Sequence, residues 1–506
     1  MRPSKPALIR GGVRTAERKH PTAERALEPV ALPERLYVSL AQHIGAPAQP
    51  TVAAGEAVAK GQRIGAPDGG LSAAIHAPAS GVVEAVTEHP APHPSGLTVA
   101  TVVIAPDGAE RWDPQRPAPL TAAAEALAPE AIAERVAEAG IVGMGGAAFP
   151  AVIKLTPRTA VETLIVNGSE CEPYLTGDDR LMRERAAAVV DGVRLMRHAL
   201  RAARAIIGVE DNKPAALEAL RRATARLGAV EVAAVPSLWP QGSEKHLVYA
   251  LTGREVPAGK LAADIGAVVH NVGTAYATHR AVREGRPLID RPVTVGGGAV
   301  ARPANLEAPL GTPFTHLLEQ AGGLREAPAR LLAGGPMMGQ QAPAEAGVAK
   351  GTTGVIALGA AEVREPGGAP CIRCGRCVAA CPMGLMPFEI ANRAAADDLD
   401  GAAAQGLDDC LACGSCAYVC PAARPLVQLF HYARGQRAEQ AAAQQRAELQ
   451  RRLAEQRAER QRREAEAKRA KAAARRQRRR GSQGQGQGTA DGPAHPPATQ
   501  TEEESP

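Results

Sequence analysis

The stretch Cys371-Ile-Arg-Cys374-Gly-Arg-Cys377-Val-Ala-Ala-Cys381-Pro382 is the most specific feature of this sequence, and its spacing recurs in Cys410-Leu-Ala-Cys413-Gly-Ser-Cys416-Ala-Tyr-Val-Cys420-Pro421. Eight of the nine cysteines lie in these two runs, so they do not form a disulfide framework spread through the chain. Structural zinc also uses Cys-x2-Cys pairs, but it needs only four ligands in two separated knuckles. Two runs of four closely spaced thiols, each followed by Pro, instead favour two [4Fe-4S] clusters.

The fourth cysteine of each run indicates how the thiols are shared. The first three cysteines of a run lie on one tight loop and can bind three irons of one cubane, whereas the fourth follows a turn and points away. In two-cluster ferredoxins this fourth cysteine binds the other cluster. We therefore predict a two-cluster ferredoxin domain over residues 363–432, which carries one electron at a time. Its ligand sets are Cys371, Cys374, Cys377 and Cys420 for one cluster, and Cys410, Cys413, Cys416 and Cys381 for the other.

The size and composition of the chain describe a multidomain globular protein. Its 506 residues correspond to about three to five domains. Hydrophobic residues make up 45% and charged residues 22%, which excludes a wholly disordered or fibrous chain. No apolar run reaches the roughly 18 residues of a membrane-spanning helix, and the polar start lacks a secretory signal, so we expect the chain to stay in the cytoplasm.

The net charge of +6 belongs to the C-terminal tail, which we place at residues 433–506. Residues 441–480 carry 15 Lys and Arg against 5 Glu, whereas residues 1–440 carry 44 basic and 44 acidic side chains. Pairs such as Glu459 and Arg463 stand four residues apart and support a solvated helix. The Gly- and Gln-rich end from residue 481 has the composition of a disordered segment.

Two segments make up the first 112 residues of the chain. Residues 1–34 form a mostly irregular arm, and residues 35–112 contain short strand-like runs broken by Gly and Pro. Within the second segment, residues 58–65 and 76–83 resemble a barrel-sandwich hybrid of the biotinyl or lipoyl type. The lysine that such carrier domains need is replaced by the sequence Ala-Pro-Ala-Ser-Gly at 77–81, so we predict a scaffold.

The middle of the chain predicts an α/β domain and a second small β domain, so the fold class is multidomain α+β. Strand-like runs at residues 161–166, 205–209 and 230–235 alternate with Ala-rich helical runs. This alternation over residues 120–285 favours βα units in a mainly parallel, Rossmann-like sheet, which binds nucleotides at its strand ends. Residues 286–362 return to short strands with one helix at 313–320, as in a β-grasp domain.

A glycine-rich loop, Gly140-Ile-Val-Gly-Met-Gly-Gly-Ala-Ala-Phe-Pro-Ala-Val-Ile-Lys154, precedes the first strand of the α/β domain. Closely spaced glycines let backbone N–H groups approach a phosphate, and a following lysine supplies charge. The loop alone is a weak signal, because a Gly-rich turn without a ligand and a solvated lysine give the same pattern.

Three further segments, at residues 167–174, 241–245 and 269–274, strengthen the nucleotide hypothesis. Together with the glycine loop they resemble the flavin-binding face of the NADH-oxidising flavoprotein subunit of respiratory complex I. The order of domains over about residues 30–430 resembles the RnfC (RsxC) family, which belongs to the Rnf (Rsx) electron transport complexes. Two departures stand out: Ala148 replaces a third glycine, and Cys171 separates two glutamates.

The resemblance implies a set of flavin and nicotinamide residues. It implies non-covalent FMN whose phosphate is held by Gly143, Gly145, Gly146 and Lys154. It also implies that Asn167, Asn271 and Thr274 bind the flavin or its ribityl chain, and that Glu170, Glu172 and Glu244 shape the nicotinamide side. Without the resemblance, the residues allow another interpretation. Glu170 and Glu172 could be surface carboxylates that cap the next turn, and Cys171 could be a small, unreactive hydrophobic residue.

The function implied by the resemblance is electron input into an ion-translocating complex. The chain would pass electrons between NADH and a ferredoxin-like carrier through FMN and two [4Fe-4S] clusters, and no side chain would act as a nucleophile or general acid. It would bind other subunits of the complex on the cytoplasmic face of the cell inner membrane. The basic tail would add about 1 kcal/mol per suitably placed residue on anionic lipid.

Two other functions are compatible with parts of the sequence. A flavin-free iron–sulfur relay or docking subunit would take electrons from another protein, but Lys154 and the paired Glu170 and Glu172 argue against a decayed nucleotide site. A nucleic-acid-binding or redox-sensing protein would use the basic tail. Almost no aromatic residues lie among those charges, so only weak, salt-sensitive phosphate binding is expected, and no specific nucleic acid.

Overall fold

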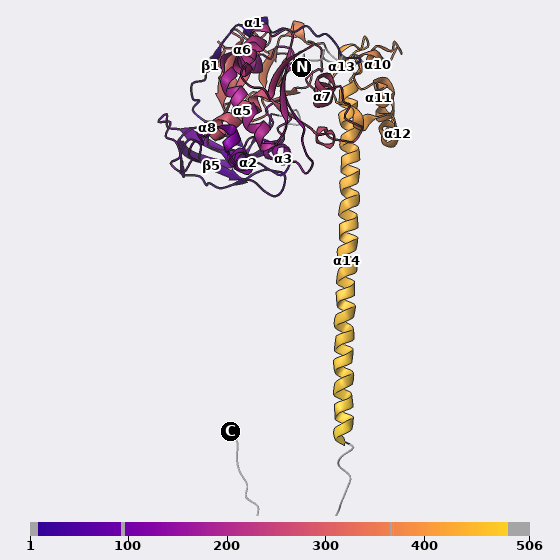
Figure 1. Ribbon diagram of the computed structural model, residues 1–506. Coiled ribbons are helices and arrows are strands. Elements are labelled where there is room, and N and C mark those ends of the chain that lie inside the picture. The colour runs from indigo at the N-terminus through magenta and orange to yellow at the C-terminus, as the bar shows by residue number, and fades with distance from the viewer. Residues whose placement is uncertain (1–8, 93–96, 365–366, 368, 484–506) are drawn as a thin grey trace, which may run out of the picture. The chain divides into compact units, whose positions relative to one another are not determined.

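The computed structural model describes residues 9–92, 97–364, 367 and 369–483 (Figure 1). The chain divides into two compact units, one up to Ala433 and one from Arg434 onward. The first unit contains the four predicted domains, and the second contains most of the long last helix.

The N-terminal arm contributes to a sheet that belongs to a later domain. Its described part forms helix α1 (His20–Ala23) and strand β1 (Leu27–Pro29), and β1 pairs in parallel with β14 (Ala304–Pro309). Two small sheets then enclose an apolar core that includes Leu36, Ile64 and Ile104. The first, in spatial order, is β2 (Leu36–Ser39), β8 (Thr98–Pro106), β7 (Gly81–Pro90) and β4 (Ala57–Val58). The second is β3 (Gln49–Pro50), β5 (Arg63–Ala66) and β6 (Ile75–His76).

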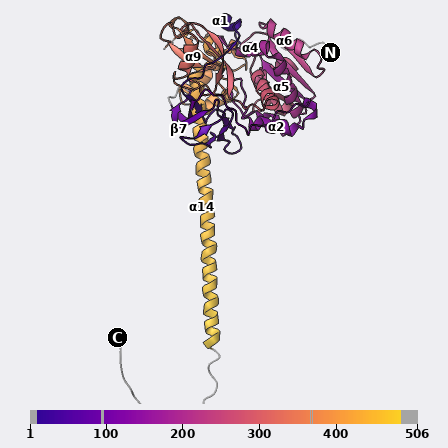
Figure 2. The ribbon, with the colours of Figure 1, turned by 90° about the vertical axis from the view of Figure 1, so that its left-hand side faces the viewer.

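The α/β domain is built on a four-stranded sheet in which every pairing is parallel. Its spatial order is β11 (Val230–Val235), β10 (Arg204–Glu210), β9 (Thr163–Gly168) and β12 (Ala267–Asn271). Its helices are α2 (Pro129–Glu138), α3 (Ala151–Leu155), α4 (Gly177–Glu184), α5 (Ala186–Ala199), α6 (Pro214–Thr224), α7 (Glu244–Thr252) and α8 (Val272–Arg283). Helices α2, α4, α5 and α6 gather on one side in Figure 2.

Alternation along β9 explains why both faces of this sheet are covered. Leu164 and Val166 belong to the large core that also contains residues of α5, α6 and α8. Ile165, between them, packs instead with Leu247 and Val248 of α7. Because successive side chains of a strand point to opposite faces, the apolar run of β9 buries itself twice, as parallel sheets require.

The contact between α5 and α8 depends on a glycine. A Cβ atom added at Gly192 would lie 1.8 Å from the carbonyl oxygen of Ala275, which is backbone and cannot turn aside. We therefore expect Gly192→Ala to lower the free energy of unfolding of this domain by about 3 kcal/mol through overpacking. Gly228→Ala is the matched control, because nothing lies within 4 Å of its added Cβ. Chemical denaturation of the two variants tests this, and equal midpoints would contradict it.

The next domain is a six-stranded mixed sheet with one helix. Its spatial order is β1, β14, β13 (Asp290–Gly296), β17 (Gly354–Leu358), β15 (Arg330–Ala333) and β16 (Gln340–Gln341). Helix α9 (Phe314–Gln320) buries Phe314 and Leu317 against Leu306 and Val293 of the sheet. The helix expected at residues 313–320 is therefore present, with Pro313 at its N-cap.

The cysteine-rich domain repeats its backbone as it repeats its sequence. Gly375 precedes α10 (Arg376–Ala380) with φ of 74°, and Gly414 precedes α13 (Ser415–Tyr418) with φ of 76°. Between the two repeats lie α11 (Pro387–Ala395) and α12 (Leu399–Ala404). A core of Ile390, Leu407 and Phe430 closes the domain.

The last helix, α14 (Leu426–Gln483), begins in the first unit and makes up the described part of the second. Within the second unit, Leu449 and Leu453 are exposed, so they form no core there. The predicted pair Glu459 and Arg463 forms an ion pair of 2.6 Å. None of the described helices combines the length and apolar character needed to span a bilayer.

Lys350 joins three domains of the first unit. Its Nζ donates to the carbonyl oxygens of Ala74 (2.6 Å) and Gly140 (2.7 Å), and its backbone N–H donates to Gln42 Oε1. The side chain is completely buried, and this burial lowers its pKa to about 7. A neutral amine has two N–H groups, which match the two carbonyl acceptors.

The low pKa of Lys350 predicts a pH-dependent stability. Between pH 7 and 10.5 the unfolded chain holds a proton that the folded chain has released, so the free energy of unfolding rises with pH through this window. This stabilisation of the folded state is fully present above the unfolded pKa of 10.5 and is lost as the pH falls through the folded pKa of about 7. We expect Lys350→Met to have a lower free energy of unfolding than wild type at both pH 7 and pH 9. Its free energy of unfolding should also rise by about 2 kcal/mol less than that of wild type between these two pH values. Urea denaturation at both pH values measures this, and parallel curves would refute it.

Candidate functional site

The candidate site lies at the carboxyl ends of β9 and β12. From β9 the chain proceeds to β10 on one side, and it later returns to β12 on the other side. In open α/β sheets, ligands bind in the crevice at such a switch of strand order. Asn167 near the end of β9 and Asn271 at the end of β12 are partners in the sheet register, so both stand at this crevice.

The glycine loop lies across these strand ends. Its turn is closed by Gly143 N–H donating to the Phe149 carbonyl (2.8 Å), and Met144 N–H donates to Thr274 Oγ1 (3.0 Å). An added Cβ at Gly145 would lie 3.4 Å from Asn271 Cβ, while one at Gly146 would meet nothing within 4 Å. The loop is therefore packed on one side and open at Gly146, which leaves room for a ligand.

Ala148 follows the open part of this loop and has a φ of 48°. This is the left-handed region, where Gly is favoured and an L-residue is strained. The replacement of the usual glycine thus keeps the backbone conformation that a glycine would adopt. The loop is not forced into another conformation at this position.

Lys154 on α3 reaches the same strand ends. Its Nζ donates to Glu244 Oε2 (2.6 Å) and to the Val269 carbonyl (3.1 Å). Glu244 is the first residue of α7, so the ion pair connects two helices that flank the crevice. The side chains are 32% and 37% exposed, which leaves the ammonium accessible to an anion.

The two asparagines each hold part of the backbone around the crevice. Asn167 donates through Nδ2 to the Gly242 carbonyl (2.8 Å) and accepts from Ser169 N–H (2.9 Å). Asn271 accepts from Gly273 N–H (2.7 Å) as the N-cap of α8. It also donates to Asp178 Oδ2 (2.7 Å), a residue that no sequence pattern had marked.

Two of the three predicted nicotinamide-side glutamates, Glu170 and Glu172, have backbone partners. Glu170 accepts from the N–H groups of Asp178 (2.8 Å) and Asp179 (3.0 Å) in the first turn of α4. Glu172 accepts from the N–H groups of Met337 (3.0 Å) and Met338 (2.8 Å), in the six-stranded domain. Desolvation raises the pKa of each carboxyl group to about 7. Both carboxylates fix the course of the loop between β9 and α4.

Several other groups lie in the same loops. Ser169 Oγ and Gln241 Nε2 are buried and have no hydrogen-bond partner among the described residues. Unpaired buried polar atoms beside Asn167 and Gly242 suit a bound polar ligand. Cys171 is partly buried beside Gly242. Desolvation raises the pKa of its thiol, as expected for an unreactive cysteine. Ser169 and Gln241 lie within segments that the sequence pattern had already marked.

The open glycine loop, Lys154 and the unpaired Ser169 and Gln241 together fit FMN. The loop offers backbone N–H groups and the lysine offers charge for a phosphate. The amide and hydroxyl groups near the ends of β9 and β12 offer partners for polar ring and ribityl atoms. Thr274, like Asn167 and Asn271, already has a partner within the protein, because its hydroxyl accepts a hydrogen bond from the glycine loop.

The eight cysteines of the two runs surround two cavities. The first is lined by Cys371, Cys374, Cys377 and Cys420, together with Ile372, Phe388 and Leu426. The second is lined by Cys381, Cys410, Cys413 and Cys416, together with Leu385, Ile390 and Phe430. Each cavity thus takes three thiols from one run and one from the other. Four thiols around an otherwise mostly apolar cavity fit an iron–sulfur cluster.

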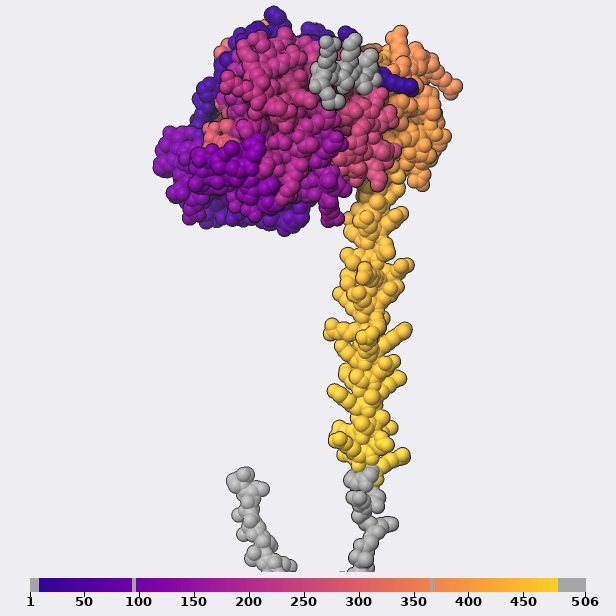
Figure 3. All heavy atoms as spheres, viewed as in Figure 1, coloured from indigo at the N-terminus to yellow at the C-terminus, as the bar shows by residue number. Residues whose placement is uncertain are grey.

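The second cavity adjoins the α/β domain. Trp239 Nε1 donates to the Cys413 carbonyl (2.7 Å), and His246 Nε2 lies 3.2 Å from the Pro382 carbonyl. Trp239, Cys413 and Ala380 share one apolar cluster with the partly buried Cys171. Figure 3 shows the α/β domain in pink against the orange ferredoxin domain.

Comparison with known proteins identifies four domains along the chain. A family model described as the RnfC barrel sandwich hybrid domain matches residues 7–109, and the Nuo51 FMN-binding domain matches residues 136–280. An SLBB domain matches residues 292–341, and a 4Fe-4S dicluster domain matches residues 370–423.

Three relatives align with most of the chain. The C subunit of the ion-translocating oxidoreductase complex of Rhodobacter capsulatus is 52% identical over 85% of this chain and 83% of its own length. The protein of the same description from Pseudomonas aeruginosa is 46% identical over 87% of this chain and 57% of its own. The C subunit of the proton-translocating ferredoxin:NAD(+) oxidoreductase complex of Clostridium ljungdahlii is 42% identical over 75% and 82%.

Proposed function

Because this chain belongs to the RnfC family of ion-translocating oxidoreductase complexes, we propose that it is the subunit through which such a complex exchanges electrons with NADH. The observation that carries the proposal is the convergence of the glycine loop, Lys154, Asn167 and Asn271 at the carboxyl ends of β9 and β12. This is the place where an α/β sheet binds a nucleotide.

In this proposal each group of the site has a binding or orienting role. The N–H groups of Gly145 and Gly146 and the ammonium of Lys154 hold the FMN phosphate, while Gly143, whose N–H donates to the Phe149 carbonyl, keeps the turn of the loop closed. Asn167 and Asn271 bind the flavin, and Thr274 supports this binding by holding the glycine loop at Met144. When bound, FMN would take two electrons from NADH and release them singly to two [4Fe-4S] clusters.

The nicotinamide side is formed by the loop that leaves β9. Glu170 and Glu172 hold this loop against α4 and against residues 337–338. Glu244, the first residue of α7, keeps Lys154 at the strand end when no phosphate is bound. These carboxylates therefore shape and orient the nicotinamide site and need not transfer a proton.

The two cysteine sets have different surroundings, so we expect them to exchange electrons with different neighbours. The set with Cys413 adjoins the α/β domain through Trp239. In the other set Cys374 is exposed, and the neighbouring Ile372 is 66% exposed. The exposed set therefore suits contact with a ferredoxin-like carrier or another subunit of the complex.

The location that follows from this function is the cytoplasmic face of the inner membrane. A peripheral subunit there would meet anionic lipid headgroups with the basic residues of α14. Each suitably placed Lys or Arg would add about 1 kcal/mol at low ionic strength. Vesicle co-sedimentation with and without anionic lipid tests this part of the proposal.

The deciding experiment is anaerobic purification of the full chain with iron, sulfide and FMN counted, followed by optical titration with NADH. About eight irons and one FMN that bleach together are expected. Eight irons without flavin or bleaching would contradict the NADH proposal. That outcome would make the chain an iron–sulfur relay that receives electrons from another protein.

A further inference from the structure

We propose that Lys19, on the N-terminal arm, is the positioning residue that sets the conformation of the loop at residues 169–176. The inference rests on the proposed function, because this loop is proposed to form the nicotinamide side of the flavin site. Nothing in the sequence around Lys19 marked it, since its partners lie more than 150 residues away.

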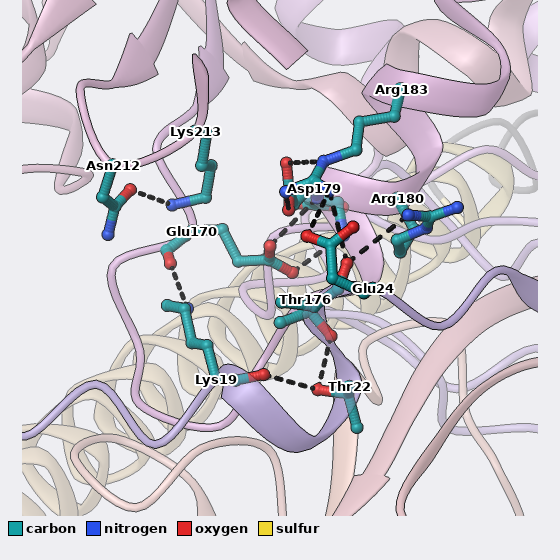
Figure 4. A network of polar contacts seen from close by, with 12 residues as sticks. Lys19, Thr22, Glu24, Glu170, Thr176, Asp179, Arg180, Arg183, Asn212 and Lys213 are labelled. Carbon is teal, nitrogen blue, oxygen red and sulfur yellow. Dashed lines mark hydrogen bonds and ion pairs between the residues drawn. The ribbon is translucent and has the colours of Figure 1, made fainter. Parts of the chain in front are cut away.

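The ammonium of Lys19 organises the loop through its backbone. Nζ donates to the carbonyl oxygens of Glu170 (2.8 Å), Glu172 (2.8 Å) and Leu175 (2.5 Å). An ammonium group has three N–H donors, and here all three meet carbonyls of one short loop. The loop therefore wraps around a single positive charge that the arm supplies, and Figure 4 shows its bond to Glu170.

This wrapping explains two unusual backbone conformations. Glu170 has a φ of 47° and Tyr174 has a φ of 67°, although neither is glycine. Left-handed conformations of such residues persist only where the surrounding structure enforces them, and they gather at functional sites. The three carbonyl groups that bind Lys19 lie at, between and next to these two residues. Lys19 therefore helps to hold both conformations, together with the Glu17 carbonyl, which accepts a hydrogen bond from Tyr174 N–H (2.8 Å).

The same wrapping determines where two carboxylates go. With the carbonyls of Glu170 and Glu172 bound to Lys19, their side chains extend to other partners. Glu170 caps the first turn of α4, and Glu172 binds the N–H groups of Met337 and Met338. The loop is thus held by its carbonyls on one side and by its carboxylates on the other.

The arm itself is anchored on both sides of Lys19. Before it, Gly12 N–H donates to the Ala380 carbonyl (3.0 Å), and Val13 pairs with Trp239. After it, Thr176 Oγ1 donates to Thr22 Oγ1 (2.8 Å), and Asn305 Nδ2 donates to the Thr22 carbonyl (2.9 Å). The ammonium is therefore presented at a fixed place in relation to the α/β domain.

Nearby carboxylates partly offset the cost of burying the Lys19 ammonium. Burial lowers the pKa of Lys19, and the neighbouring charge of Lys213 lowers it further, although Lys213 is itself paired with Glu210. Glu170 and Glu210 oppose this shift and favour the charged form. Figure 4 shows Lys19, Glu170 and Lys213 around one region. A neutral side chain of similar length at position 19 would leave three carbonyls without a donor and remove the charge that balances Glu170.

The test compares Lys19→Met with wild type and with Lys60→Met in the full chain. Lys60 is the matched control, because it is also a partly buried lysine whose ammonium has a partner, here Glu110, but it lies in the barrel-sandwich domain. We expect hydrogen exchange at residues 169–176 to become roughly tenfold faster or more in Lys19→Met, with exchange in α5 unchanged. Iron and FMN content should stay at wild-type values, while the KM for NADH rises roughly tenfold and kcat changes little. Lys60→Met should change none of these.

Exchange in the loop that stays at the wild-type rate would overturn the proposal, as would an equal effect of Lys60→Met. If Lys19→Met fails to fold, Lys19→Arg provides the test. Its planar fork keeps the charge but cannot converge on three carbonyls, so faster exchange of the same amides is still expected. If the wild-type chain itself binds neither FMN nor NADH, the proposed function fails, whereas the exchange measurement still decides the role of Lys19.

Discussion

The Cys381→Ala variant is expected to lose the cluster of Cys410, Cys413 and Cys416 and to keep the cluster bound by the first three cysteines of its own run. The reason is that the cavity lined by Cys381 takes its other thiols from the second run. Iron content should fall from about eight to about four atoms per chain, and reduction of an external acceptor by NADH should be lost. Iron analysis and low-temperature EPR measure both.

Double variants separate exchanged ligands from ligands kept within a run. Cys381→Ala combined with Cys410→Ala should retain about four irons, because both changes affect one cluster. Cys381→Ala combined with Cys371→Ala should retain almost none. The reverse result would assign each cluster to a single run. Cys171→Ala is the control and should keep all of its iron, because Cys171 lines neither cavity.

The second large effect is expected from Lys154→Met, which should weaken FMN binding about 10- to 100-fold. A charge-assisted hydrogen bond to a phosphate contributes about 1.5–3 kcal/mol, and its loss has this size. The variant also leaves Glu244 without its cation. Titration of flavin-depleted protein with FMN, followed by fluorescence quenching, measures the dissociation constant.

Two further variants control for charge. Lys260→Met removes an exposed lysine of the same domain and should leave FMN affinity unchanged. Glu244→Gln should bind FMN at least as tightly as wild type, because it frees Lys154 and removes a negative charge from the phosphate site. If Lys154→Met binds FMN like Lys260→Met, the phosphate lies elsewhere.

Features encoded by local spacing were predictable from the sequence. The run at residues 205–209 became β10 (Arg204–Glu210), and the run at 230–235 became β11 with the same bounds. The helix predicted at 313–320 is α9, which begins one residue later, at Phe314, and ends at the predicted residue. In each case an apolar run bounded by Gly, Pro or polar residues determines the element without help from distant segments.

Features that depend on distant partners were not predictable. Asp178 matters because β9 and β12 bring Asn271 to it, and Lys350 matters because three domains meet around it. The arm was expected to be mostly irregular, yet it supplies β1 to a sheet whose neighbouring strand is almost 280 residues away. No local pattern carries such information, since the partner is chosen by the tertiary fold.

The two cavities, each lined by cysteines of both runs, bear on the biogenesis of this protein. If the thiols of each cavity bind one cluster, neither run alone supplies all four ligands of the same cluster. A nascent chain stalled between Cys381 and Cys410 therefore cannot hold a complete cluster. Completion of one cluster then waits until Cys416 has emerged from the ribosome, and completion of the other waits until Cys420 has emerged. Chains truncated between the two runs would then contain no complete iron–sulfur cluster, so the order of the cysteines prevents fragments that carry only one of the two clusters.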